Sequence, residues 1–470
     1  MASSSDALRA AWLFIAVVTL WRVAMLWVNR TDLFVDEAQY WAWGQHLDWG
    51  YFSKPPLIGW VIRAVTDILG ADTPFAVRLA APLFHMATAL AVIWAARAFV
   101  DAWVAAWAGA IYVAMPLISI GSNLISTDTI MLPFFALALG LYGRLIERPS
   151  AMRAIALGAA IGAGLMAKYA MVYFVLCAGL VWVLQPAQRV RLRDAALSGG
   201  VALMVFTPNI LWNLRNDAQT VRHLVEENAQ VGRVDLNWGG ALGFVLEQAV
   251  AFGPLLFVAL FYVLVRRPRG AELTLLLFCV PIIAIVTGQA LASRAFGNWA
   301  ATAYIAAPIL AASVLQNRRG VLMISQVLNM LVVLALPLLA AFPDALRGAD
   351  DQPLLKRYLG LHAVSEMAAL RAAEAGLTTL SSHERALLAD FFYTLDDSNF
   401  DLFAWGREGD KIGSWYHAEF LIARPLSAPI AYLDDDPPPC AGARDLGAIE
   451  PEYGAWAGRG LRLWELPAGC

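Results

Sequence analysis

The stretch FVDEAQYW, residues 34–41, is followed at residues 51–57 by YFSKPPL, and these two segments decide how the rest of the chain is interpreted. They place two adjacent acids, a lysine and several aromatic rings just after the first long apolar segment. Charged groups near lipid are costly unless water, a partner or a substrate meets them. A cluster of this kind at a membrane edge therefore indicates a functional site.

The composition of the 470 residues is that of a membrane protein. Apolar residues make up 60%, charged residues only 15%, and the mean hydropathy is +0.59, whereas soluble domains have an apolar share nearer half. Apolar runs of roughly 17 to 25 residues can cross the hydrocarbon layer as helices. About eleven such runs are predicted, at 10–28, 75–99, 102–121, 128–146, 153–167, 169–185, 195–212, 241–265, 271–289, 299–316 and 320–341.

Basic residues in short loops predict the orientation, because such loops stay on the cytoplasmic side. With the N-terminus in the cytoplasm, arginine clusters recur at every second loop. The clusters are Arg144, Arg148 and Arg153; Arg189, Arg191 and Arg193; Arg266, Arg267 and Arg269; and Arg318 and Arg319. The opposite, extracytoplasmic face then holds the C-terminal tail and residues 29–74, 122–127, 213–240 and 290–298.

The net charge excludes one class of partner, and the positions of the four cysteines indicate their expected state. A net charge of −3, without a basic patch that contains aromatic residues, argues against nucleic acid as a partner. Cys177 and Cys279 fall inside predicted spans, where cysteine usually packs as a small apolar residue. Cys440 and Cys470 lie in a tail predicted to face an oxidising compartment, so a disulfide and two free thiols both stay open.

The composition changes near residue 342, where long apolar runs stop and charged residues and prolines increase. Two domains are predicted: a transmembrane domain, residues 1–341, and a small extracytoplasmic α/β domain, residues 342–470. In the tail, Ser381 and Glu384 form the pattern of a capping box that opens a helix through about Leu395. Short apolar runs predict strands at 376–380, 402–405, 419–423, 430–433 and 461–466.

The first outer loop is predicted to contain two helices that lie along the membrane surface. Residues 38–47 are rich in tyrosine and tryptophan, which are enriched at that interface, and residues 57–69 are amphipathic. The predicted fold class is therefore mostly α: a polytopic transmembrane helix bundle with interfacial helices in the first outer loop and a small α/β domain.

Asp36 and Glu37 are the leading catalytic candidates. Adjacent residues on a helix face different directions, so the two acids cannot act as a facing pair. One interpretation makes Asp36 the general base that takes a proton from an acceptor hydroxyl, while Glu37 orients the loop or the acceptor. The alternative is that both acids cap the helix N-terminus, where negative charge favours the dipole.

A third acid and several cations complete the candidate set. Asp128 begins a predicted span after Ser126 and Thr127, and helix capping explains this triplet as well as catalysis does. Lys54 precedes two prolines that keep its segment extended, which suits a fixed cation for a departing sugar phosphate; the alternative is a lysine that reaches lipid head groups. The other candidates for the donor phosphate are Lys168, Arg78 and Arg294.

Four side chains are predicted to line a substrate cavity: Tyr40, Tyr51, Tyr169 and His223. The histidine is alone in a long outer loop, and no second ligand is fixed by its spacing, so it does not predict a metal site.

The two segments quoted first resemble the bacterial branch of the dolichyl-phosphate-mannose protein mannosyltransferase family, one of the integral-membrane C-type glycosyltransferases. That family also includes the aminoarabinose transferase that modifies lipid A. Later stretches that look like the same branch are Ser122–Thr129, Met166–Ala170, Trp212–Leu214 with Arg222 and His223, and Ser293–Arg294 with Asn298–Trp299. The resemblance covers residues 10 to about 315.

The resemblance implies a glycosyltransferase of the bacterial inner membrane with a polyprenyl-phosphate-linked sugar as donor. Transfer would occur with inversion, on the extracytoplasmic face, to a hydroxyl of lipid A, another glycan or a protein. Asp36 would match the catalytic acid of the first outer loop, and Lys54 would lie near the donor phosphate. The aminoarabinose transferase has an acid, associated with a bound metal, where this chain has Ser53, so no metal and no other cofactor is predicted.

Two other classes of protein were weighed against an enzyme. A transporter of a lipid-linked or small polar solute tends to place coupling acids near the midplane and to contain two similar halves. The sequence shows neither feature. A membrane sensor that uses the tail as a binding module would leave the acid and lysine cluster of the first loop unexplained.

Overall fold

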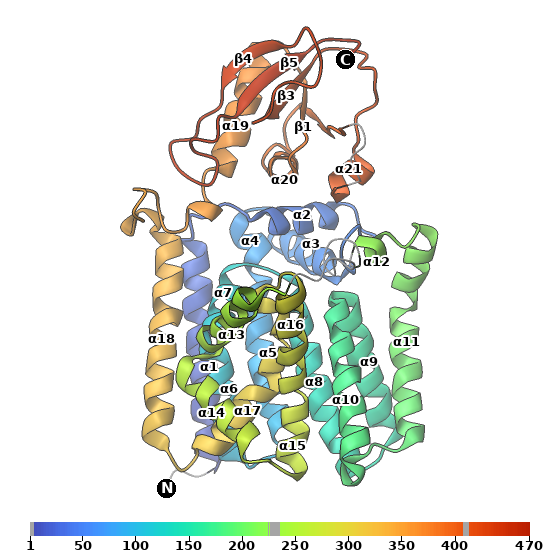
Figure 1. Cartoon of the computed structure of the whole chain (residues 1–470), viewed down its shortest axis with the longest axis vertical. Coiled ribbons are helices and arrows are strands. Elements are labelled where there is room, and N and C mark those ends of the chain that lie inside the picture. Colours follow the sequence, from blue (N-terminus) through green and yellow to red (C-terminus); the bar gives the residue numbers. More distant parts are fainter. Residues whose placement is uncertain (1–3, 224, 226–235, 408–412) are drawn as a thin grey trace. The chain divides into compact units, whose positions relative to one another are not determined.

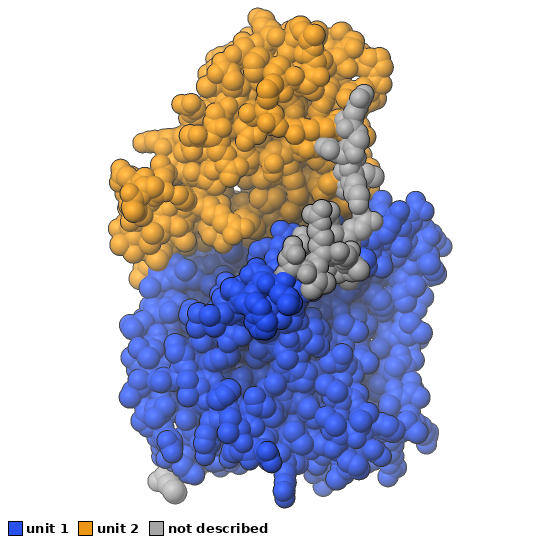
Figure 2. Space-filling view, viewed as in Figure 1, with its two compact units in different colours: residues 1–27, 53–58, 78–337 blue, residues 28–52, 59–77, 338–470 orange. Residues whose placement is uncertain are grey.

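The structure is a computed structural model that describes residues 4–223, 225, 236–407 and 413–470 (Figure 1). It contains two compact units, coloured separately in Figure 2. Unit 1 comprises Met1–Trp27, Ser53–Ile58 and Arg78–Pro337, and unit 2 comprises Val28–Phe52, Gly59–Val77 and Leu338–Cys470. The first outer loop thus falls mostly in the same unit as the C-terminal tail.

Long apolar helices dominate the part of the chain that the structure describes. Six are long and apolar enough to cross a membrane: α1 (Ser4–Trp27), α4 with α5 (Pro74–Ala96), α8 (Thr127–Glu147), α11 (Leu192–Arg215), α15 with α16 (Gly270–Ala292) and α18 (Arg319–Ala341). Helices suit this environment because they satisfy their backbone hydrogen bonds internally. The chain is therefore a multi-pass membrane protein.

The other predicted apolar segments are also helical, but some are bent or short. α6 (Ala102–Ala114) and α7 (Pro116–Asn123) form a pair bent by 53°, and α13 (Trp238–Phe252) and α14 (Pro254–Val265) form a pair bent by 111°. Counting each pair as one span gives up to eight candidates. The shorter apolar helices are α9 (Ala151–Ala167), η1 with α10 (Tyr169–Leu184) and α17 (Ala303–Leu315).

The sharpest bend has a clear local cause. Gly253 has a φ of 102°, which a residue with a side chain rarely adopts, and Pro254 lacks the N–H that would continue α13. The break leaves the carbonyl of Phe252 outside a regular helix, and Asn329 Nδ2 donates to that oxygen at 3.2 Å. A Cβ at position 253 would collide with the Asn329 side chain.

Small residues allow the helices of unit 1 to pack closely. α9 lies against α8 and α11 (Figure 1). Gly158 and Gly162 face α11, where an added Cβ would meet the Ser198 carbonyl or the Val205 side chain. This spacing of small residues is typical of helix pairs in membranes. The buried Arg22 of α1 donates from Nη2 to the carbonyl of Val113 at 2.8 Å, while its Nε has no hydrogen-bond partner among the described residues.

Unit 2 contains a five-stranded mixed sheet with short helices. The strands are β1 (Thr379–Ser382), β2 (Asp401–Ala404), β3 (Ile430–Asp434), β4 (Arg444–Ala448) and β5 (Arg462–Leu466), in the order β2-β1-β3-β5-β4. β1 pairs in parallel with β2 and β3, whereas β5 is antiparallel to β3 and β4. The helices are α2 (Val35–Gln45), most of α3 (Leu57–Leu69), α19 (Leu361–Glu374), α20 (Arg385–Thr394) and α21 (Trp415–Glu419).

Apolar side chains and a disulfide hold one end of the sheet. The core there contains Trp405, Leu426, Ile430, Tyr432 and Leu466, with Cys440 and Cys470 packed against it. The two cysteines form a disulfide with a Cα–Cα distance of 5.8 Å. Of the two alternatives left open by the sequence, the structure contains the disulfide.

The structure corrects the predicted elements of the tail in three places. Residues 419–423 do not form a strand, because α21 extends to Glu419 and only one bridge, at Leu421, follows. β4 was missed because its sequence, RDLGA, is polar and mostly exposed. Ser381 lies in β1, and the cap of α20 is Glu384 itself, whose side chain accepts the N–H of Ala386.

Candidate functional site

Asp36 and Glu37 begin α2 but have different surroundings. Glu37 is almost completely buried, at 1% exposure, and its Oε2 accepts the backbone N–H of Phe34 at 2.9 Å. The capping alternative therefore describes Glu37 well. The Asp36 side chain is 45% exposed and turns to a different partner.

The partner of Asp36 is Arg385, at the first position of α20. Arg385 Nη2 donates to Asp36 Oδ1 at 2.5 Å, and Arg385 Nε donates to Gln39 Oε1 at 2.9 Å. Among the residues that the structure describes, Asp36 Oδ2 has no hydrogen-bond partner. Burial lowers the pKa of Arg385, but the Asp36 carboxylate outweighs this effect and leaves the pKa above its usual value. Arg385 is therefore charged at neutral pH.

A buried tyrosine lies close to this pair. The side chain of Tyr416, on α21, is fully buried, and its hydroxyl has no hydrogen-bond partner among the described residues. It is near enough to Arg385 and Asp36 to interact with both electrostatically, while burial raises its pKa. Tyr416 is therefore a neutral phenol that can donate a hydrogen bond.

Two of the predicted cavity residues brace the loop after α2. Tyr51 is buried and stacks on Trp43 with ring centroids 4.6 Å apart, and its hydroxyl donates to the carbonyls of Trp43 and His46 at 2.7 and 2.9 Å. Tyr40 is also buried, with its ring 5.2 Å from that of Trp43. Both rings are thus packed within unit 2, Tyr40 on the helix that carries Asp36 and Tyr51 after it.

Unit 1 holds a second acid and cation pair. Lys168 Nζ donates to both carboxylate oxygens of Asp128 at 2.7 Å, and Asn298 Nδ2 donates to Asp128 Oδ2 at 2.8 Å. Only 9% of the Asp128 side chain and 18% of the Lys168 side chain are exposed. Ser126, rather than Asp128, accepts the N–H of Thr129 at the start of α8. The carboxylate of Asp128 therefore joins α8, the end of α9 and the short helix η4 (Gly297–Ala300).

Tyr169 follows Lys168 and is fixed by two asparagines of α11. Its hydroxyl donates to Asn209 Oδ1 at 2.8 Å and accepts from Asn213 Nδ2 at 3.2 Å. Asn209 and Asn213 are buried. The turn between α9 and α10 thus presents Lys168 and Tyr169 from a fixed backbone.

The remaining predicted residues differ in how far they are buried. Arg78 is buried, at 1% exposure, Lys54 is partly buried, and Arg294 is exposed with its guanidinium 5.9 Å from the Phe296 ring. His223 ends α12 (Gln219–His223) and is partly exposed, and residues 224 and 226–235 of the same predicted outer loop lie outside the described residues. Lys54 belongs to unit 1 and Asp36 to unit 2, so their joint action on one donor stays a prediction.

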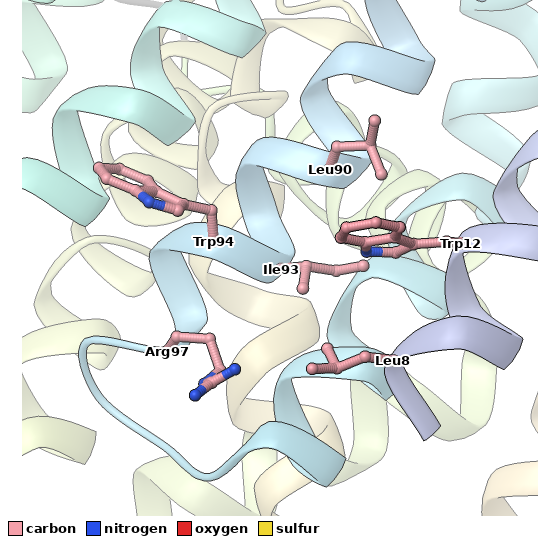
Figure 3. A pocket seen from close by; sticks show the side chains of 6 residues that line it. All are labelled: Leu8, Trp12, Leu90, Ile93, Trp94 and Arg97. Atoms are coloured by element: carbon pink, nitrogen blue, oxygen red, sulfur yellow. The ribbon is translucent and has the colours of Figure 1, made fainter. Parts of the chain in front are cut away.

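An acidic cluster and an apolar hollow lie outside the predicted site. The carboxylates of Asp434, Asp435 and Asp436 lie within 4.8 Å of one another, but Arg407 already pairs with the first and third of them. A hollow of about 260 Å³ in unit 1 is lined by Leu8, Trp12, Leu90, Ile93, Trp94 and Arg97 (Figure 3). This hollow is almost entirely apolar and contains none of the predicted site residues.

Sequence reasoning missed Arg385, Gln39 and Tyr416. One signal for Arg385 was present, because a positive charge in the first turn of a helix opposes the helix dipole. The predicted start of a helix near Glu384 therefore placed an arginine where it needs an acidic partner. Which acid it meets could not be predicted, because Asp36 lies 349 residues away in the chain.

Comparison with known proteins agrees with the resemblance seen in the sequence. Residues 53–212 match the family described as dolichyl-phosphate-mannose-protein mannosyltransferase. The lipid A galacturonosyltransferase RgtD of Rhizobium johnstonii is 37% identical over 470 residues, covering 98% of this chain and 99% of that protein. The lipopolysaccharide core galacturonosyltransferase RgtA of the same organism is 27% identical, covering 53% of this chain and 51% of its own length.

A solved structure shows the same fold. ArnT from Cupriavidus metallidurans, bound to undecaprenyl phosphate, matches with a TM-score of 0.67 at 17% identity, covering 96% of this chain and 97% of ArnT. Its apo form matches with a TM-score of 0.65. The match includes the C-terminal region as well as the helical bundle.

Proposed function

The chain belongs to the dolichyl-phosphate-mannose-protein mannosyltransferase family and is a polyprenyl-phosphate-sugar-dependent glycosyltransferase; from that premise we propose that it transfers galacturonate to lipid A. The observation that carries this proposal is the 37% identity to a lipid A galacturonosyltransferase over nearly the whole of both chains. RgtA, which matches over about half of its own length and has the same sugar in its name, supports the choice of sugar.

We assign the proton transfer of this reaction to Asp36. The carboxylate removes the proton of a lipid A hydroxyl, and the freed oxygen attacks the anomeric carbon of the donor sugar on the face opposite the phosphate. The bond from that carbon to the phosphate oxygen breaks, and the phosphate leaves with the bonding electrons. The new glycosidic bond then has inverted configuration. The half-exposed side chain of Asp36 and its free Oδ2 suit this role.

The departing polyprenyl phosphate needs a positive charge, because negative charge grows on its oxygens as the bond breaks. We assign this role first to Lys54, whose segment is held by Pro55 and Pro56. Lys168 already neutralises Asp128, so we assign that pair, with Asn298, to positioning. Arg78 and Arg294 stay as further candidates for the phosphate.

We propose eleven membrane spans with the N-terminus in the cytoplasm and the tail, from residue 342, outside. The long helices, bent pairs and shorter apolar helices occur in the order of the eleven predicted segments, which supports the count. The disulfide between Cys440 and Cys470 supports an oxidising environment for the tail. Labelling of single introduced cysteines tests this topology: Gly348→Cys should react from outside and Arg318→Cys only after the membrane is opened.

The decisive experiment uses purified protein with a polyprenyl-phosphate galacturonate donor and lipid A. Mass spectrometry of the lipid should show the addition of one galacturonosyl group, and the product should disappear with Asp36→Asn. Transfer of a neutral sugar in preference to galacturonate, or no transfer to lipid A, would contradict the proposal.

A further inference from the structure

Arg385 has more hydrogen-bonding capacity than its partners use. A guanidinium carries five N–H donors in a planar fork. The Nη2 and Nε atoms contact Asp36 and Gln39, whereas Nη1 has no hydrogen-bond partner among the described residues. The side chain is 39% exposed, so a molecule from solution can reach it.

The surroundings of Arg385 attract a second anion. Its position at the start of the ten-residue helix α20 adds the positive end of the helix dipole to its own charge. The buried hydroxyl of Tyr416, which has no hydrogen-bond partner in the described structure, interacts electrostatically with the same guanidinium. Asp36 supplies one negative charge to this environment, and its contact with Arg385 leaves Nη1 of that arginine unused.

The chemistry of the proposed sugar fits the unused donors. Galacturonate differs from galactose by a carboxylate in place of the hydroxymethyl group on C5. That carbon is joined through the ring oxygen to the anomeric carbon, at which the base-activated hydroxyl attacks. A cation in contact with the base therefore lies within one sugar ring of the carboxylate.

We propose that Arg385 is the residue that recognises the carboxylate of the transferred uronic acid, while it stays in contact with Asp36. Guanidinium groups bind carboxylates with parallel hydrogen bonds, which makes them specific as well as strong. Arg385 would also offset the repulsion between the sugar carboxylate and Asp36. This inference rests on the proposed galacturonate donor and adds to it the residue that selects the sugar.

The test compares two donors in the full-length protein in nanodiscs: polyprenyl-phosphate galacturonate and polyprenyl-phosphate galactose, with lipid A as acceptor. The readout is the ratio of kcat/KM for the two donors in each preparation, because this ratio does not depend on the fraction of protein that is folded. The variants are Arg385→Gln and Arg385→Lys. The control is Arg444→Gln, which removes an exposed arginine that pairs with Glu465 at the sheet edge.

The unmodified protein should prefer galacturonate by roughly 100-fold, as expected for a charge-assisted hydrogen-bonded contact. Arg385→Gln should reduce that preference to within about fivefold by lowering only the galacturonate rate, while Arg385→Lys keeps an intermediate preference. The control should keep the full preference. Arg444→Gln should leave the rates with both donors unchanged, because Arg444 has no role in the proposed recognition of the carboxylate.

Two results would overturn the inference in different ways. An equal fall for both donors in Arg385→Gln would show that Arg385 only positions Asp36. Absence of galacturonate transfer by the unmodified protein would refute the proposed function itself, and this result is read before any variant is compared.

Discussion

The Asp128–Lys168 pair and the Asp36–Arg385 pair differ in how much of the carboxylate is left without a hydrogen-bond partner among the described residues. Asp128 has both oxygens bound by Lys168 and one also by Asn298, and little of its side chain is exposed. Asp36 has one oxygen bound by Arg385, and nearly half of its side chain is exposed. A fully bound carboxylate holds helices together, whereas a partly bound one can still accept a proton. This difference supports our proposal that Asp128 has a structural role and that Asp36 takes part in the chemistry.

The largest effect is expected for Asp36→Asn. Turnover should fall about 1,000-fold, because an amide cannot act as the general base. The free energy of unfolding should change by less than about 1 kcal/mol, since the lost ion pair is partly exposed. Sugar transfer to lipid A and thermal unfolding measure the two quantities. The control is Asp67→Asn, which changes the exposed Arg63–Asp67 pair of α3 and should leave both quantities unchanged. If Asp36→Asn keeps more than a tenth of the activity, Asp36 is not the general base.

The next largest effect is expected for Asp128→Asn, and it is a loss of stability. This change leaves the charge of Lys168 largely buried without a counter-charge, which should lower the free energy of unfolding by roughly 3 kcal/mol. Adding Lys168→Met should recover most of that loss. Asp351→Asn, at a position that is 90% exposed, serves as the control and should change little. An unchanged unfolding temperature together with lost turnover would reverse the roles assigned to the two acids.

A third acid, Asp390, should make the free energy of unfolding depend on pH. It is buried on α20, where Ser365 and Thr394 donate to its carboxylate, and burial raises its pKa from 3.8 to about 6. The folded state therefore holds this proton more tightly than the unfolded state does, so stability falls as pH rises from about 4 to 6. The loss is roughly 3 kcal/mol in total. Unfolding measured by tryptophan fluorescence should show this slope, and Asp390→Asn should flatten it; an unchanged slope would point to other groups.

The smallest effect is expected for Glu37→Gln. The amide oxygen can still accept the N–H of Phe34, whereas the favourable interaction of the charge with the helix dipole, about 0.5 to 1 kcal/mol, is lost. Turnover should fall less than about fivefold, the rate equivalent of that energy. Assays run beside those of Asp36→Asn measure the contrast. Equal losses for the two adjacent acids would mean that Glu37 contacts the substrate.

Local patterns were sufficient for much of the fold. Each predicted apolar segment contains a helix, and the two helices of the first outer loop are confirmed as α2 and α3. The family resemblance and the glycosyltransferase activity are also confirmed. The helices depend on periodicity and composition over short windows, where the physical signal is strongest, whereas the family and the activity came from the resemblance of the quoted motifs.

Features that depend on distant contacts were not predicted. The Asp36–Arg385 contact joins residues 349 positions apart, and the Asp128–Lys168 contact spans 40 positions. Nothing in either local sequence specifies the partner. The bend at Gly253–Pro254 had a local signal, but the apolar run on both sides concealed it within one predicted segment.

The same bend constrains the order in which the chain can be assembled during synthesis. The amide that caps the Phe252 carbonyl belongs to Asn329, 77 residues later. Until Asn329 has been synthesised, the Phe252 carbonyl must accept a hydrogen bond from water or from a lipid head group. An unsatisfied backbone carbonyl is costly in hydrocarbon. The bend between α13 and α14 therefore gains its final hydrogen bond only after α18 has left the translocon.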